Sequence, residues 1–381
     1  MSHIWANIRV HMEHSPRQWG DVVASYLERS QSRALSLVLD FTIDPNPFAE
    51  SDVWPRLVWD SAAWSMLCAH ATRWKSVYLD AIPRAAYVER LVSCPILSRL
   101  SVGLEDMADV PTQFFADAPA LKTFAVSSED TLSPFALPGA WKLTEFALRD
   151  KTAAVSGDLC GACAPALRSC SSTLVHLRVS VQVGGEWEGP PVLLEALQTM
   201  SLARGACRLM CRHLTVPNIQ RLRLRGGWKS FRTEELDALQ SLVQRSCGLV
   251  ELRILDLYAI AASGTGILRC LAILPSVTSL LLDIHTHPNL NEQYSIVHGL
   301  TRSDVGQYSA NDVGLLPNLT TLSIRFAYKF SASHGLEGAV LNMLRSRASG
   351  MLVAGVSLSP LEAFSSDLGD WPVSSSRLLP Q

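Results

Sequence analysis

The stretch Pro217–Gly226, Pro-Asn-Ile-Gln-Arg-Leu-Arg-Leu-Arg-Gly, sets the strongest limit on the fold of this chain. Its apolar residues are Ile219, Leu222 and Leu224, and arginines stand at positions 221, 223 and 225. A helix would spread those arginines around its circumference, whereas a strand places the two leucines on one face and the arginines on the other. The stretch therefore predicts a strand with one apolar face and one basic face.

The same spacing, apolar-x-x-apolar-x-apolar, recurs along most of the chain. It occurs at Leu97/Leu100/Val102, Leu121/Phe124/Val126, Leu143/Phe146/Leu148, Leu174/Leu177/Val179, Leu197/Met200/Leu202, Ile219/Leu222/Leu224, Leu249/Leu252/Ile254, Val277/Leu280/Leu282 and Leu319/Leu322/Ile324. In five cases a proline stands two residues before the first apolar position, where it ends a preceding helix and favours an extended chain. These prolines are Pro95, Pro119, Pro217, Pro275 and Pro317. The recurrence predicts an internal repeat with one strand in each copy.

Helical patterns lie between the strands. Four helices are predicted: one that is capped by Ser15 and begins at Pro16, one around Ser61–His70, one at Thr233–Cys247 and one at Gly335–Arg347. Two further strands are predicted before the regular repeats, at Ala34–Asp40 and Trp74–Leu79. A single strand with its return helix cannot bury its apolar side, but stacked copies bury one continuous core. We therefore expect an α/β solenoid of the horseshoe kind, with a parallel sheet on the concave face and helices and loops on the convex face.

The repeats divide the chain into three segments. Residues 1–31 are predicted to be an entry segment with a helix, and residues 32–358 the repeat domain. Residues 359–381 are rich in serine and proline and weakly patterned, so part of this tail is predicted to be disordered.

Composition narrows the possible partners. Hydrophobic residues make up 48% of the chain and charged residues 18%, which is enough apolar material for a continuous core. The formal net charge of −2 argues against binding to nucleic acid or to an anionic membrane. The chain has no apolar run near the roughly 20 residues that span a bilayer and no signal-peptide core, so we expect a cytoplasmic or nuclear protein with reduced cysteines.

We searched the sequence for catalytic and metal-binding patterns and expect neither an enzyme nor a metal or other cofactor. The pair Cys160/Cys163 would need the second set Cys207, Cys211 and His213 to form a zinc site, and buried thiols are the simpler interpretation. His285 and His287 lie on one side of an extended chain but have no carboxylate-rich neighbour in the sequence. Gly264-Thr-Gly266 lacks the third glycine of a dinucleotide fingerprint, and the carboxylates are scattered rather than paired.

The outer face of the predicted sheet is the surface that could carry function. Alternation along the strands places arginines there mainly in the central copies, and they are Arg149, Arg178, Arg221, Arg223, Arg225 and Arg253. Guanidinium groups match carboxylates and phosphates, so we hypothesise that this patch binds an acidic or phosphorylated segment of a protein partner. The alternative is a solvated strand face whose arginines pair with Glu145 and Glu251.

The recurring spacing resembles leucine-rich repeats. The asparagine that those repeats carry three residues past the last apolar position is absent, because the residues there are Glu105, Glu129, Lys151, Gln182, Gly205, Gly227, Leu257, His285 and Ala327. We therefore expect an irregular array with variable loops instead of a uniform asparagine ladder.

The N-terminal third adds a closer resemblance. Ile4-Trp5-Ala-Asn-Ile8, the run from Tyr26 to Leu37 and Arg73-Trp74-Lys-Ser-Val77 resemble fungal, mushroom-type F-box proteins with irregular leucine-rich repeats. Only the downstream flank of the F-box is present, since the F-box itself would precede Ile4.

This resemblance implies the substrate-recognition part of a cullin-RING (SCF) ubiquitin ligase subunit, which would bind the ligase adaptor only with an F-box restored upstream. The alternative is a stand-alone leucine-rich-repeat interaction domain unrelated to ubiquitin. A repeat enzyme with catalytic loops would need clustered titratable groups at the strand ends, which this sequence lacks.

Overall fold

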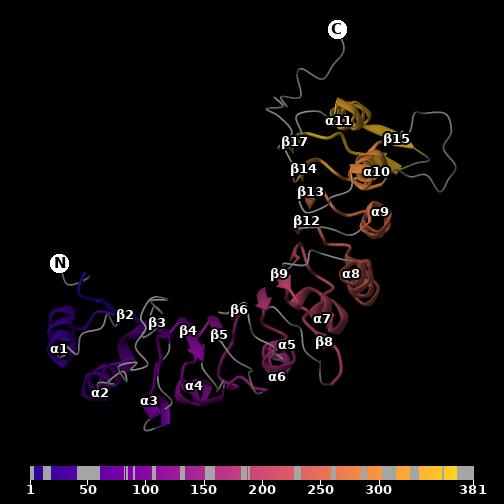
Figure 1. Ribbon diagram of the computed structural model, residues 1–381. Coiled ribbons are helices and arrows are strands. Elements are labelled where there is room, and N and C mark those ends of the chain that lie inside the picture. Colours follow the sequence, from indigo (N-terminus) through magenta and orange to yellow (C-terminus); the bar gives the residue numbers. More distant parts are fainter. Residues whose placement is uncertain are drawn as a thin grey trace, which may run out of the picture. The chain divides into compact units, whose positions relative to one another are not determined.

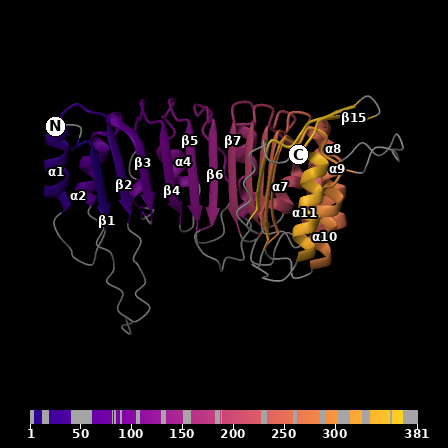
Figure 2. The ribbon, with the colours of Figure 1, turned by 90° about the horizontal axis from the view of Figure 1, so that it is seen from above.

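The structure is a computed structural model that describes most of the chain. The described residues are 4–11, 19–40, 61–80, 82, 85–88, 91–104, 109–128, 134–150, 159–181, 187, 189–226, 233–258, 263–284, 290–302, 315–326, 334–353 and 356–366. The chain forms two compact units, Met1–Leu174 and Val175–Gln381. The fold is α/β, and within each unit the parallel strands lie side by side in chain order as an open sheet (Figures 1 and 2).

The first unit holds six of these parallel strands. They are β1 (Asn7–His11), β2 (Leu35–Asp40), β3 (Trp74–Asp80), β4 (Arg99–Leu104), β5 (Thr123–Ser128) and β6 (Glu145–Asp150). Its helices are α1 (Trp19–Ser30), α2 (Ser61–Ala69), the 3-10 turn Ala71–Arg73, α3 (Ala85–Val88), α4 (Asp109–Phe114), α5 (Leu159–Ala162) and α6 (Ala164–Ser169).

The second unit holds seven parallel strands and longer helices. The strands are β7 (His176–Val181), β9 (Thr199–Arg204), β11 (Arg221–Arg225), β12 (Ile254–Tyr258), β13 (Ser279–Ile284), β14 (Thr321–Phe326) and β17 (Ala363–Ser366). The helices are α7 (Ala206–His213), α8 (Thr233–Arg245), the 3-10 turn Cys247–Leu249, α9 (Gly264–Ala272), α10 (Leu290–Leu300) and α11 (His334–Arg347). Two small sheets complete it, the parallel pair β8 (Val192–Leu193) and β10 (Leu214–Thr215) and the antiparallel pair β15 (Met351–Val353) and β16 (Val356–Leu358).

The predicted strand faces are confirmed for almost every copy of the repeat. Leu222 and Leu224 are fully buried and lie in register with Met200 and Leu202 on the neighbouring strand β9. The same inward positions are buried on every other strand that follows the predicted spacing. The apolar face of the strands therefore packs against the helices and forms the core, while the alternate side chains form the face that we call the outer face of the sheet.

One copy of the repeat was predicted in the wrong phase. The structure places Leu255 opposite Leu222 and Leu257 opposite Leu224, so Ile254 lies opposite Arg221 on the outer face. The repeat spacing is still present, but it runs through Leu252, Leu255 and Leu257 instead of starting at Leu249. Leu249 is buried in a left-handed turn before the strand, with φ of 50°. This correction changes which side chains of β12 belong to the outer face.

Two rows of short polar side chains connect neighbouring copies of the repeat in place of the absent asparagine ladder. Residues just before the first apolar position donate to backbone carbonyls of the preceding copy, namely Thr173 to Leu143, Asn218 to Glu195, Ser276 to Leu249 and Asn318 to Pro275, at 2.7–3.1 Å. Residues just after it do the same, namely Ser98 to Lys75, Thr144 to Lys122, Thr278 to Arg253 and Thr320 to Thr278, at 3.1–3.4 Å. These hydrogen bonds connect neighbouring copies at the edge of the sheet where the strands begin. The carbonyls of the second row also accept backbone N–H groups of the following copy, so there the side chain adds to an existing backbone hydrogen bond.

Arginines add a second connection, in which a side chain binds free carbonyls at or near the C-terminal end of the preceding helix. Arg73 donates to the Arg33 carbonyl and to the Ser30 hydroxyl beyond α1. Arg245 donates to the carbonyls of Cys211 and Leu214 at the end of α7. The carbonyls at a helix C-terminus lack intrahelical partners and carry partial negative charge, so a guanidinium satisfies both needs. We call this arrangement the helix-end clamp.

The deepest helix-end clamp is formed by Arg347, which is only 1% exposed. Its guanidinium donates to the carbonyls of Leu300 at 2.6 Å, Leu315 at 2.6 Å and Leu316 at 3.4 Å. Burial, together with the neighbouring charge of Arg302, lowers the pKa of Arg347 to about 10, so the side chain stays charged at neutral pH.

Both ends of the chain contribute strands that were not predicted. Asn7–His11, assigned to an F-box-flanking segment, forms β1, pairs with β2 and buries Ile8. Ala363–Ser366, assigned to the weakly patterned tail, forms β17, pairs with β14 and buries Phe364. Ser15 and Pro16, predicted to start the first helix, and the rest of the tail from residue 367 lie outside the described residues. Within the described part of the chain, no helix has the length and apolar character needed to cross a bilayer.

The predicted elements between these ends agree with the structure. The expected strands at Ala34–Asp40 and Trp74–Leu79 are β2 and β3. The expected helices correspond to α2, α8 and α11, with ends that differ by one or two residues. Element ends are the least certain part of such predictions because helix ends fray.

Cysteine reactivity is the first testable consequence of this packing. Of the eight described free cysteines, Cys247 is exposed and the others are buried. Burial raises the pKa of Cys94, Cys170, Cys207 and Cys270 to about 12. Only the thiolate reacts rapidly, so these four thiols are expected to stay protonated and unreactive at pH 8.5, while Cys247 is expected to react first with iodoacetamide.

Peptide mapping of the labelled protein checks this prediction, with Cys247→Ser as the control that removes the fast site. The pKa of these thiols is higher in the folded than in the unfolded protein. Their contribution to the free energy of unfolding therefore falls as the pH rises from about 9 to 12. Rapid labelling of Cys207 or Cys270 in the native protein would contradict the packing described above.

Candidate functional site

The outer face of the second unit carries the predicted arginines in a regular register. Arg178 on β7 lies opposite Ser201 on β9, which lies opposite Arg223 on β11. Arg221 and Arg225 flank Arg223 on the same side of β11, because side chains alternate along a strand. Neighbouring strands are about 4.8 Å apart, so the Arg178 and Arg223 backbones are separated by about 10 Å.

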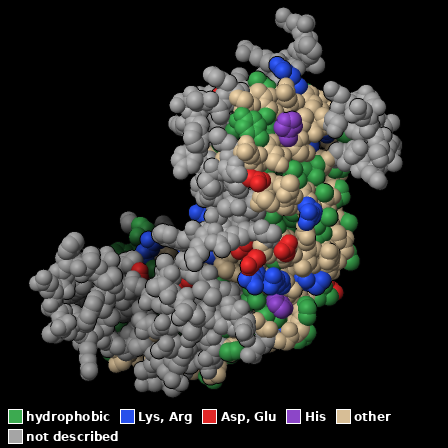
Figure 3. Space-filling model, turned by 45° about the vertical axis from the view of Figure 1, so that its right-hand side comes forward, with side chains coloured by type: hydrophobic (Ala, Val, Ile, Leu, Met, Phe, Trp, Pro, Cys, Tyr) green, Lys and Arg blue, Asp and Glu red, His purple; other side chains and the backbone are tan. Residues whose placement is uncertain are grey.

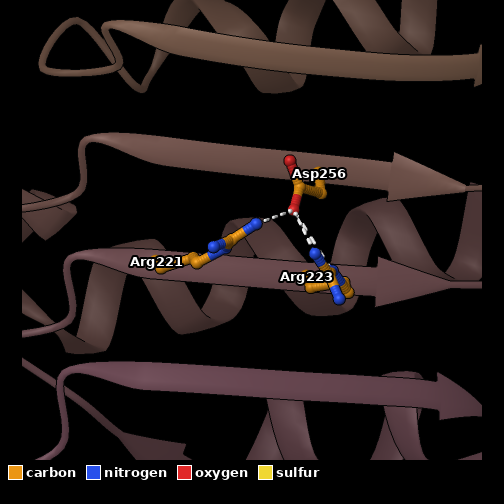
Figure 4. Close-up of polar contacts among 3 residues, drawn as sticks. All are labelled: Arg221, Arg223 and Asp256. Carbon is orange, nitrogen blue, oxygen red and sulfur yellow. Dashed lines mark hydrogen bonds and ion pairs between the residues drawn. The ribbon is translucent and has the colours of Figure 1, made fainter.

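The structure adds a carboxylate that the sequence analysis did not place on this face. Asp256 of β12 lies opposite Arg223, and its Oδ2 accepts hydrogen bonds from Arg221 Nη2 at 3.1 Å and from Arg223 Nε at 3.2 Å (Figure 4). The Asp256 side chain is 7% exposed, whereas those of Arg221 and Arg223 are 43% and 40% exposed. The guanidinium of Arg223 also lies over the Tyr258 ring, 5.7 Å from its centroid. Asp256 and Tyr258 therefore hold two arginines in place while leaving part of each accessible to solvent.

The other two arginines of this face are not held in this way. Arg178 and Arg225 are exposed, and among the described residues no carboxylate lies within ion-pair distance of either guanidinium. The strand between them, β9, carries only short outward side chains, Thr199, Ser201 and Ala203. Among the described residues, these four arginines thus have one carboxylate within ion-pair distance, and the strand between them carries small side chains, so this part of the face carries excess positive charge.

Two of the six predicted site residues lie elsewhere. Arg253 precedes β12, in the position that Gln220 takes before β11, and its guanidinium contacts Glu251 at 3.9 Å and the Ser276 carbonyl at 3.3 Å. Arg149 is exposed on β6 in the first unit, so it is described with that unit and not with the arginines of the second. Burial and the Asp80 carboxylate raise the pKa of Tyr78 to about 12, and Arg149 acts on this phenol in the opposite direction.

The alternative, in which the predicted arginines pair with Glu145 and Glu251, agrees with the structure for Glu251 and Arg253. Glu251 pairs with Arg253 outside the strand. Glu145 accepts a hydrogen bond from Thr123 at 3.4 Å in the first unit. The carboxylate that binds two face arginines is Asp256, which the sequence analysis did not consider. The overlapping spacing Leu252/Leu255/Leu257 is the sequence signal that would have revealed it.

Apolar side chains also occur on the outer face, on the strands that follow the arginines. Ile254 and Tyr258 of β12 and Leu281 of β13 are half-buried there, with Leu281 in register with Asp256. Serine and threonine fill the neighbouring outward positions Ser279 and Thr321. The face is therefore basic over β7 to β11, while the outward positions of β12 and β13 hold apolar side chains together with Asp256 and Asp283.

The described residues include some of the catalytic and metal-binding candidates. Among the described residues, no group of three or more His, Cys, Asp or Glu side chains could hold a metal ion. Cys207 and Cys211 are buried in α7, while His285 and His287 lie outside the described residues. Gly264 and Gly266 begin α9, where the Ser263 hydroxyl accepts a hydrogen bond from the Gly266 N–H and the Glu292 carboxylate accepts one from the Gly264 N–H.

On the face shown in Figure 3, described basic and acidic side chains lie beside one another, so charge there is mixed in sign.

Comparison with known proteins yields no relative. No protein-family model matches the chain, and no curated protein matches it. The resemblance to F-box proteins therefore depends on the sequence motifs quoted above, and the function has to be argued from the surface itself.

Proposed function

We propose that this protein is a non-enzymatic interaction scaffold that binds a protein partner through the outer face of the sheet in its second unit. One observation carries the proposal: Arg178 and Arg225 are exposed and have no carboxylate partner among the described residues, on the same face as Arg221 and Arg223. Isolated surface arginines are common, but these four lie on β7 and β11, on either side of a strand with small outward side chains, and this arrangement suits an anion. Planar guanidinium groups suit carboxylates and phosphates.

The contacts around Asp256 support binding. A side chain that is ordered before its ligand arrives loses less conformational entropy on binding, about 0.5–1.5 kcal/mol for each side chain. Asp256 and Tyr258 order Arg221 and Arg223 in this way, and the Asp256 carboxylate also neutralises part of their charge. Arg178 and Arg225 supply the unneutralised charge. The expected partner is an acidic or phosphorylated protein segment.

The finer proposal is that the repeats form a leucine-rich-repeat horseshoe with this face on its concave side, as the substrate-recognition part of an F-box-type ubiquitin ligase subunit. The parallel strands in chain order and the sequence motifs of the N-terminal third support it. The alternative is a stand-alone leucine-rich-repeat domain with the same binding face and no role in ubiquitylation.

The double variant Arg178→Ala/Arg225→Ala tests the binding face. Truncating an arginine at an interface hot spot commonly weakens binding by about tenfold or more, so the double variant is expected to weaken partner capture by about 100-fold. The matched control is Arg253→Ala, because Arg253 is also exposed but lies before the strand. Quantitative affinity capture at two salt concentrations measures the effect, and equal capture by both variants would contradict the proposed face.

Partner turnover separates the two forms of the proposal. If the protein selects substrates for ubiquitylation, removing it from its native cells is expected to lengthen the half-life of the captured partner several-fold. A pulse-chase measurement with and without proteasome inhibitor checks this. An unchanged half-life would favour the stand-alone interaction domain.

A further inference from the structure

The apolar part of the outer face carries information about the partner beyond its charge. Ile254 and Leu281 are diagonal neighbours on β12 and β13, because Ile254 is paired with Ser279 and Asp256 with Leu281. Strand spacing and rise place them about 8 Å apart, close enough for one side chain to contact both. The other outward positions of these two strands are Asp256, Tyr258, Ser279 and Asp283, so Ile254 and Leu281 are the aliphatic side chains there, and such side chains gain stability when something covers them.

We propose that the partner segment combines an acidic group with a large apolar side chain three or four residues away in an extended chain. The acidic group binds over β9, between Arg178 and the row of arginines on β11, and the apolar side chain packs on Ile254 and Leu281. This inference rests on the proposed function, since it uses the same face and the same arginines.

The spacing follows from the register of the strands. Leu281 lies two strands beyond Arg223 and three beyond Ser201 at the same level of the sheet. At about 4.8 Å for each strand, these steps are about 10 Å and 14 Å. An extended segment advances about 3.3 Å per residue, so it covers this distance in three or four residues when it crosses the strands. Asp256 lies between the two parts of the site, but its carboxylate is covered by Arg221 and Arg223 and does not face the segment as a free charge.

Synthetic peptides test this inference on the full chain. The probes are fluorescein-labelled peptides of glycine and serine that carry two adjacent glutamates and one leucine, placed one to seven residues after or before the acidic pair. Fluorescence anisotropy measures their affinities. The tightest binding is expected with the leucine three or four residues from the glutamates, about tenfold tighter than for the peptide without leucine, because burying a leucine side chain is worth at least that factor.

Substitutions on the outer face test which residues cause the preference for a leucine at this spacing. Leu281→Ser and Ile254→Ser are expected to remove the advantage of the leucine and to leave the leucine-free peptide unaffected. Arg178→Ala/Arg225→Ala is expected to weaken every acidic peptide. Thr321→Ser, on the next strand, is the matched control and is expected to change neither property. Circular dichroism confirms that each variant keeps its fold.

The outcomes distinguish this inference from the proposed function. A flat dependence on leucine position, a preference that survives Leu281→Ser, or no binding of any peptide would overturn the inference. If partner capture is nevertheless lost in Arg178→Ala/Arg225→Ala, the proposed function stands without it. If that double variant also leaves capture unchanged, both are wrong.

Discussion

Replacing Trp74 by alanine is expected to lower the free energy of unfolding of the first unit by about 3–5 kcal/mol. Trp74 begins β3 and is among the largest fully buried side chains. Its ring lies 6.0 Å from that of Trp64 and 6.1 Å from that of Phe115, measured between centroids. Removing it leaves a cavity in a cluster whose members are positioned by different copies of the repeat, so the cavity cannot close by a local shift.

Trp74→Phe is the matched variant, and it is expected to cost less than half as much. Within the described part of the chain, the Trp74 indole N–H has no hydrogen-bond partner, although it is buried. Phenylalanine keeps most of the ring and removes this unsatisfied donor, which by itself costs about 1–3 kcal/mol. Urea unfolding followed by far-ultraviolet circular dichroism measures both variants. Equal losses for Trp74→Phe and Trp74→Ala would show that the N–H is satisfied in solution.

Replacing Arg347 by methionine is expected to lower the free energy of unfolding by about 2–4 kcal/mol in the second unit. The guanidinium donates to three backbone carbonyls, and methionine fills its volume without replacing any of these hydrogen bonds. Each buried acceptor left without a donor costs about 1–3 kcal/mol, and relief from burying a charge offsets part of the total. Arg347→Lys keeps the charge but lacks the fork, so an intermediate loss is expected.

The exposed neighbour Arg345 on the same helix gives the control for this prediction. Arg345→Met removes the same charge from the same helix end and is expected to change stability by less than about 0.5 kcal/mol. Hydrogen exchange localises the effect, because a repeat contacts only its neighbours. Protection is expected to fall in α10, α11 and β14 and to stay unchanged in β2 to β6. A uniform loss of protection along the chain would contradict a local clamp.

Much of the fold could be predicted because the decisive pattern is local. Three apolar positions in six residues define a strand and its buried face, and this held for Leu222 and Leu224 as for the other copies. The terminal strands escaped prediction because β1 and β17 lie outside the regular spacing. The polar ladders and helix-end clamps also escaped it, because their acceptors are backbone carbonyls more than 20 residues away.

The candidate site could be predicted only in part for the same reason. Arg178, Arg221, Arg223 and Arg225 follow from alternation within one strand, and the structure brings them to one face. Arg253 was misplaced because the stretch Leu249–Leu257 contains two overlapping copies of the spacing, and local pattern cannot choose between them.

The amino-acid sequence alone determined the repeated strand, its buried side and the arginines on the opposite side, since each depends on residues a few positions apart. The tertiary structure decided the phase of β12, because the backbone hydrogen bonds of that strand are made with β11 and β13, roughly 30 residues away in each direction. That phase brings Asp256 to Arg221 and Arg223 and places the half-buried Ile254 on the outer face beside Leu281. The charge and the apolar character of the proposed binding face are therefore consequences of strand register.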